Sequence, residues 1–292
     1  MSLYTDGYWW SHDDLRLHYR DYGGASDAGS EAKPPIICIP GLTRNCRDWE
    51  PVAERLAGQW RVVTVSLRGR GESAYAKDAL TYVPLTYMQD IERLLIHLSI
   101  SRFVAFGTSL GGIVTMLMAS TRPDRIAGAL INDIGPKIEE IGLDRIKSYV
   151  GKASSWPTWL HSARYAAEAN AEVYPDYSLE QWIAMAKRLY RLTPNGRIVP
   201  DYDSKIALPF KLPAGESGFD LWPTLAGLKD VPSLIVRGGA SDLFSAETAQ
   251  EMLKRLPKAK LVTIPRVGHA PLLDEPEAVA GIDALLAAVV KG

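Results

Sequence analysis

The segment "FGTSLGG", residues 106–112, places one small hydroxyl group between glycines. It follows a short apolar run and precedes an apolar helical pattern, so a buried strand is expected to end where a helix begins. Gly107, Ser109 and Gly111 fit the G-x-S-x-G pattern, in which a tight strand-to-helix turn exposes the serine. Neighbours larger than glycine would collide with the adjacent strand and helix. The segment therefore predicts a nucleophilic serine, Ser109, at the end of a buried strand.

Strand-like apolar runs alternate with helical patterns on both sides of this turn, which predicts an α/β fold with a mostly parallel sheet flanked by helices. The run at residues 15–23 alternates like an early antiparallel edge strand. The other short runs are rich in β-branched residues, and they cover residues 34–40, 61–67, 102–109, 125–135, 232–239 and 259–265.

The alternation stops between residues 137 and 228, in a stretch that is helical in parts and carries many aromatic residues. Because the sheet pattern resumes afterwards, we interpret the stretch as an insertion. We expect a core domain of residues 1–136 and 229–292 and a helical cap domain of residues 137–228. Most cap aromatics are needed for packing, and the candidates for substrate contact are Trp156, Trp159 and Trp182.

Composition bounds the class of protein. The 292 residues are 47% hydrophobic and carry a formal charge of −1, which argues against nucleic acid or a membrane surface as the main partner. The start of the chain lacks the pattern of a secretory signal, and no apolar run reaches the roughly 20 residues of a membrane helix. Two cysteines, Cys38 and Cys46, do not suggest a disulfide framework. We expect a cytoplasmic protein that binds a small-molecule substrate. The sequence leaves open whether the chain forms a homodimer.

A serine hydroxyl needs an adjacent base to remove its proton. His269 lies in "IPRVGHAPLLDEP", directly after the last predicted strand, where it can approach the serine turn. It is therefore the predicted base. The remaining histidines are interpreted as packed or surface residues, although the one in the insertion could touch substrate: His12, His18, His97 and His161.

The base needs a carboxylate that orients its ring. Asp242 follows the strand run at residues 232–239, and Asp133 follows the run at residues 125–135. Asp242 is the predicted acid, because Ser109, Asp242 and His269 stand in the order serine–acid–histidine. Asp133 is the main competitor and stays open as a substitute.

An oxyanion hole needs two N–H donors directed at the place where negative charge develops. Leu110 follows the predicted nucleophile and supplies one backbone N–H. The second is expected in the turn after residues 34–40, most simply from Leu42. No cluster of metal ligands stands out in the sequence, so neither a metal nor an organic cofactor is expected.

With these residues in place, the chain resembles the α/β-hydrolase superfamily over nearly its whole length. The matching pieces are "IPGLTRN", "SLRGRGES", "GTSLGG", "RGGASD" and "GHAPLLDEP", in the usual order and spacing. The resemblance implies an eight-stranded sheet with a helical cap inserted after strand six. Carboxylesterases and meta-cleavage product hydrolases are similar capped enzymes that use the same three residue types.

Two classes of reaction fit this resemblance. The leading hypothesis is hydrolysis of small, fairly hydrophobic carboxylic esters or lactones through an acyl-enzyme on Ser109. The alternative is hydrolysis of carbon–carbon bonds in dienoate ring-cleavage products. A ligand receptor that keeps the fold is a further hypothesis. Slow turnover with tight retention of product would favour it, and rapid multiple turnover of simple esters would count against it.

Overall fold

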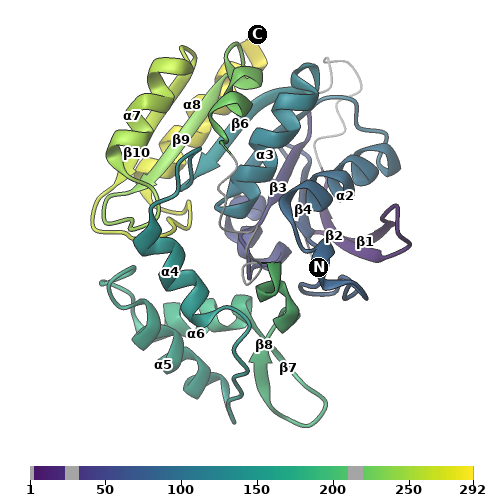
Figure 1. The fold of residues 1–292 in the computed structure, drawn as a ribbon, viewed down its shortest axis with the longest axis vertical. Helices are drawn as coiled ribbons and strands as arrows, with labels where there is room; N and C mark the ends of the chain where they lie inside the picture. Colours follow the sequence, from purple (N-terminus) through teal and green to yellow (C-terminus); the bar gives the residue numbers. More distant parts are fainter. Residues whose placement is uncertain (1–2, 24–32, 210–219, 292) are drawn as a thin grey trace.

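The computed structural model describes residues 3–23, 33–209 and 220–291, which fold around one eight-stranded sheet (Figure 1). The strands lie in the order β1-β2-β4-β3-β5-β6-β9-β10. Their bounds are β1 Thr5–Trp10, β2 Arg16–Tyr22, β3 Ile36–Ile39, β4 Val62–Ser66, β5 Phe103–Thr108, β6 Ile126–Asn132, β9 Ser233–Gly238 and β10 Ala259–Ile264.

The sheet is mostly parallel, as the sequence predicts. Only β1 with β2 and β2 with β4 pair antiparallel, and the other neighbours run in the same direction. The run at residues 15–23 forms β2, but it is not the edge strand. β1 pairs with its outer side, and only one residue of β1 is buried. That half-exposed hairpin lacks the continuous apolar run that marks the central strands.

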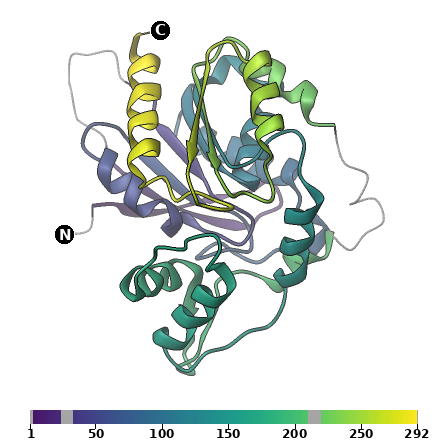
Figure 2. The same cartoon turned by 90° about the vertical axis from the view of Figure 1, so that its left-hand side faces the viewer.

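Helices cover both faces of the sheet. Ile37 and Cys38 are adjacent on β3 and belong to two different apolar clusters, because successive strand residues point to opposite faces. Figure 2 shows α7 and α8 on opposite sides of the sheet. One face is covered by α1 Glu50–Leu56 and α8 Pro276–Lys291, and the other by α2 Pro84–His97, α3 Leu110–Thr121 and α7 Ala246–Arg255.

All but the last of the elements between β6 and β9 lie together beyond one end of the sheet (Figure 1). Most have their own apolar cluster around Trp182 and Met185. A two-stranded antiparallel sheet interrupts the helices, which the sequence did not reveal. The elements that the structure describes there are α4 Glu140–Tyr149, α5 Trp159–Asn170, α6 Leu179–Leu189, β7 Tyr190–Leu192, β8 Ile198–Pro200 and the 3-10 helices η4 Ser204–Ala207 and η7 Trp222–Leu228.

The last of these elements, η7, packs against the main core. A Cβ on Gly227 would lie 2.0 Å from the carbonyl oxygen of Ala119 on α3, so the two elements are in close backbone contact. Leu225 and Leu228 are buried in the same cluster as α3. The cap domain expected from the sequence, residues 137–228, therefore includes η7, although this element packs in the core.

Two further observations concern the described residues. None of their helices is both long enough and apolar enough to cross a lipid bilayer. Cys38 and Cys46 are buried free thiols.

Candidate active site

The turn at Ser109 joins β5 to α3 with little room. Ser109 has φ 52° and ψ −115°, a backbone conformation that L-residues rarely adopt. A Cβ on Gly107 would lie 2.3 Å from the carbonyl oxygen of Gly111, and a Cβ on Gly111 would lie 2.0 Å from that of Ile39. The glycines around the serine are therefore required by the close approach of helix and strands, as the sequence indicated.

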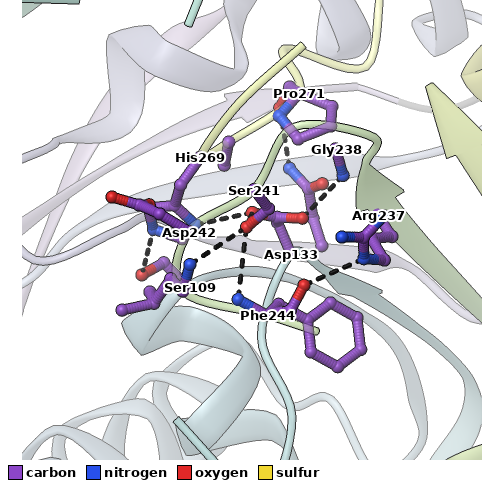
Figure 3. A network of polar contacts seen from close by, with 12 residues as sticks. Ser109, Asp133, Arg237, Gly238, Ser241, Asp242, Phe244, His269 and Pro271 are labelled. Atoms are coloured by element: carbon purple, nitrogen blue, oxygen red, sulfur yellow. Dashed lines mark hydrogen bonds and ion pairs between the residues drawn. The ribbon is translucent and has the colours of Figure 1, made fainter. Parts of the chain in front are cut away.

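His269 reaches the serine from the loop that follows β10 (Figure 3). Its Nε2 lies 2.9 Å from Ser109 Oγ, and its Nδ1 lies 2.7 Å from a carboxylate oxygen of Asp133. Because that carboxylate can only accept, Nδ1 carries the proton and Nε2 accepts from the serine hydroxyl. Ser109 and His269, which are 160 positions apart, thus form the contact expected of a nucleophile and its base.

Asp133 is fully buried, yet its carboxylate has three hydrogen-bond donors. One oxygen accepts from the backbone N–H of Gly238 at 2.6 Å. The other accepts from the Ser241 hydroxyl at 2.6 Å and from His269. These donors compensate the cost of burying the charge and fix the plane of the imidazole ring.

The expected pairing of Asp242 with His269 is wrong. The Asp242 carboxylate accepts from Nε and Nη2 of Arg145 at 2.5 and 2.8 Å. These hydrogen bonds from Arg145 hold the pKa of Asp242 below its ordinary value. The physical reason is that Ser241, not Asp242, bonds Asp133, while Arg145 on α4 binds the Asp242 carboxylate at the wall of the pocket.

Side chains from two neighbouring segments hold the histidine loop in place. The Asn132 amide donates to the Thr108 hydroxyl at 3.1 Å and to the carbonyl of Pro271 at 2.8 Å. The Tyr174 hydroxyl, from the segment between β6 and β9, donates to the carbonyl of Ala270 at 2.6 Å. The inserted segment therefore helps to position the loop that carries His269.

Leu42 and Leu110 both have a backbone N–H that donates to no other described residue. Leu110 is buried, so its unpaired donor is available to a ligand at the serine. Both Leu42 and Ser109 line one pocket. The carbonyl of Leu42 accepts from Nε of the buried Arg70 at 2.9 Å, which anchors the loop that carries the Leu42 N–H.

A pocket of about 100 Å³ opens at Ser109 and His269, and polar side chains form much of its wall. The candidates Trp156, Trp159 and Trp182 do not line it, because they pack in the aromatic cluster of the inserted segment. Among the lining side chains that sequence reasoning missed are Arg44, Asp48, Arg145, Tyr149, Asn170 and Tyr174. Arg44 could have been found, since it lies two residues after Leu42, but the others carry no sequence signal.

The other histidines lie apart from this pocket. His18 is buried against Asp6, and His161 bonds Thr158 in its own helix turn. His12 belongs to a cluster with Asp13 and Asp90 whose ligand atoms lie within 4.8 Å of one another. The guanidinium group of Arg68 bonds both of those carboxylates at 2.7–2.9 Å, so the cluster already holds a cation of its own.

Residues 36–282 match the model of a known protein family, which is described as "Alpha/beta hydrolase family". The chain is 51% identical to a solved alpha/beta hydrolase from Novosphingobium aromaticivorans, with a TM-score of 0.92 over 98% of this chain and 99% of that one.

Two curated proteins are similar over most of their length. A 3-hydroxybutyrate-oligomer hydrolase from Cupriavidus necator is 32% identical over 91% of this chain and 90% of its own. A 2-(acetamidomethylene)succinate hydrolase from Mesorhizobium japonicum is 27% identical over 81% of both chains.

Proposed function

The chain belongs to the alpha/beta hydrolase family, and we propose that it hydrolyses small carboxylic esters or lactones through an acyl-enzyme on Ser109. The observation that carries the proposal is the continuous hydrogen-bonded chain from Ser109 through His269 to Asp133. The similar hydrolase of 3-hydroxybutyrate oligomers favours ester cleavage over the carbon–carbon alternative.

In the first half-reaction, Ser109 Oγ attacks the ester carbonyl carbon while His269 Nε2 takes the hydroxyl proton. The backbone N–H groups of Leu42 and Leu110 donate to the oxygen that becomes negative. Asp133 stabilises the imidazolium ion without taking its proton. His269 then gives the proton to the leaving oxygen, so the alcohol departs and the acyl group stays on Ser109.

In the second half-reaction, His269 removes a proton from water, and the resulting hydroxide attacks the acyl carbon. Collapse of this intermediate breaks the bond to Ser109 Oγ, which recovers its proton from His269. The acid product leaves as a carboxylate. The pocket of about 100 Å³ is small beside the roughly 300–1,000 Å³ of sites for drug-sized ligands, which favours short acyl groups.

Labelling and turnover test the proposal together. A fluorophosphonate probe is expected to modify Ser109 in the wild-type protein and to leave Ser109→Ala unmodified. p-Nitrophenyl butyrate should be turned over many times per molecule by the wild type alone. A panel with lactones and dienoate ring-cleavage compounds, compared by kcat/KM, then separates the substrate classes. Labelling at another residue, or no turnover beyond one equivalent, would contradict the proposal.

A further inference from the structure

Two arginines line the pocket of Ser109, and the proposed reaction at Ser109 uses neither. Arg44 lies in the loop after β3, and Arg145 lies on α4 in the inserted segment. Packing around the hydroxyl of Tyr149, which also lines the pocket, raises its pKa, and the charges of Arg145 and Arg44 both act to lower it. Arg44, Arg145 and Tyr149 all line the same pocket as Ser109 and His269, and this shared wall places both guanidinium groups beside the reacting hydroxyl.

An aspartate holds each guanidinium group by the same edge. Nε and Nη2 of Arg44 donate to Asp48 at 2.9 and 2.5 Å. Nε and Nη2 of Arg145 donate to Asp242 at 2.5 and 2.8 Å. Each paired edge fixes the orientation of the planar group, so a ligand would not have to order a flexible side chain.

The opposite edge of each guanidinium group is available. Nη1 of Arg44 and Nη1 of Arg145 donate to no residue that the structure describes. A guanidinium group has five N–H donors, and the edge formed by Nη1 and Nη2 matches the two oxygens of a second carboxylate. Because each aspartate balances its arginine, recognition here depends on directed donors more than on net charge.

Building on the proposed function, we propose that Arg44 and Arg145 form a carboxylate-binding subsite beside Ser109. The preferred substrates are then short esters that carry a free carboxylate as well as the scissile ester bond. The subsite would bind the free carboxylate through the Nη1 edges and leave the ester carbonyl at Ser109. Hydrogen bonds to a charged ligand group are strong enough to give about a ten- to hundredfold preference.

Two esters of equal chain length test the subsite: mono-p-nitrophenyl glutarate, which is anionic, and p-nitrophenyl valerate, which is neutral. The measured quantity is the ratio of their kcat/KM values after subtraction of uncatalysed hydrolysis. We expect a ratio above one in the wild type, and a drop of about tenfold or more in Arg44→Met and Arg145→Met. A general loss of activity cancels in this ratio.

Arg122→Met is the matched control. Arg122 bonds Asp124 through Nε and Nη2 in the same way, at 3.0 and 2.9 Å, but on an exposed surface away from the pocket. Its ratio should equal that of the wild type. If a methionine variant fails to fold, the corresponding lysine variant, Arg44→Lys or Arg145→Lys, replaces it. Lysine keeps the positive charge but lacks the planar pair of N–H donors, so the ratio of kcat/KM values should fall less than in the methionine variant.

The outcomes separate this subsite from the proposed function. If the wild type hydrolyses valerate but shows no preference for glutarate, or if the arginine variants keep the preference, the subsite is wrong and ester hydrolysis stands. If the wild type hydrolyses neither ester, the proposed function itself fails. Free glutarate should also inhibit valerate hydrolysis competitively in the wild type, and absence of inhibition counts against the subsite.

Discussion

The carboxylate of Asp133 accepts a hydrogen bond from His269 Nδ1 at 2.7 Å, although the two residues are 136 positions apart. Asp133 directly follows the last residue of β6, and three donors satisfy its buried carboxylate. Asp242 lies four residues beyond β9 and is held by Arg145. The carboxylate that pairs with His269 thus comes from the loop after β6, while the loop after β9 directs its aspartate to Arg145.

Substitution of Gly111 tests the geometry of the serine turn. A Cβ there would lie 2.0 Å from the carbonyl oxygen of Ile39, so Gly111→Ala must displace backbone. We expect a loss of about 2 kcal/mol or more in the free energy of unfolding in urea, together with loss of activity. Gly23→Ala is the control, because no atom of the described residues lies within 4 Å of the added atom. Equal stability of the two variants would refute the packing argument.

Arg70 is predicted to position the oxyanion loop. It is fully buried, and its Nε holds the carbonyl of Leu42. We expect Arg70→Met to lower kcat about tenfold with KM within about twofold, since a displaced donor weakens transition-state binding more than substrate binding. Arg70→Lys, which can still donate to that carbonyl, should recover part of the rate. Equal kcat in the methionine variant and the wild type would rule out this role.

Trp156 is predicted to stabilise the inserted segment without selecting substrate. Its ring lies 4.9 Å from that of Tyr165 and 4.6 Å from that of Tyr190, measured between centroids. Trp156→Ala should lower the free energy of unfolding by about 1–3 kcal/mol, because the ring is only partly buried. Relative kcat/KM across p-nitrophenyl esters of different length should stay as in the wild type. If Trp156→Ala changes the preference for esters of a given length, the prediction is wrong and Trp156 contacts the substrate.

Asp13 is predicted to support stability at neutral pH. Hydrogen bonds from Arg68 lower the pKa of Asp13 from 3.8 to about 2. Because the folded state binds this proton less readily, the stabilisation is present above pH 4 and is lost as the pH falls through about 2. Asp13→Asn should lower the free energy of unfolding at pH 7 by about 0.5–1 kcal/mol, since solvent screens this partly exposed pair.

Urea unfolding at pH 7 and at pH 2 checks this prediction. The difference between wild type and Asp13→Asn should shrink at the lower pH. Asp14→Asn is the control, because Asp14 forms no ion pair within the described parts of the chain. A deficit of Asp13→Asn that is the same at both pH values would contradict the role of the ionised carboxylate.

The sequence predicts the sheet and the serine turn well, because both depend on local patterns. Continuous apolar runs mark the strands that are buried on both faces, and close packing at Gly107 and Gly111 leaves only glycine. β1 was missed because a half-exposed hairpin strand lacks such a run. The hairpin of β7 and β8 also lacks a continuous apolar run, because its strands have only three residues each, and it was missed for that reason.

The choice of acid could not be made from the sequence. β6 and β9 are adjacent parallel strands, so Asp133 and Asp242 both follow strand ends at the same edge of the sheet. Both also satisfy the order serine–acid–histidine. What decides is the contact of Ser241 with Asp133 and of Arg145 with Asp242, and the second contact depends on the placement of α4. The pocket arginines depend on the same tertiary placement.

The most direct test compares kcat for p-nitrophenyl butyrate in Asp133→Asn and Asp242→Asn, with the fold of each variant checked by circular dichroism. A neutral ester is used so that displacement of Arg145 does not affect substrate binding through charge. We predict that Asp133→Asn lowers kcat on the order of 10⁴-fold, because His269 loses the partner that fixes its tautomer. Asp242→Asn should lower it less than about tenfold. A large loss in Asp242→Asn with near-normal turnover in Asp133→Asn would contradict the account.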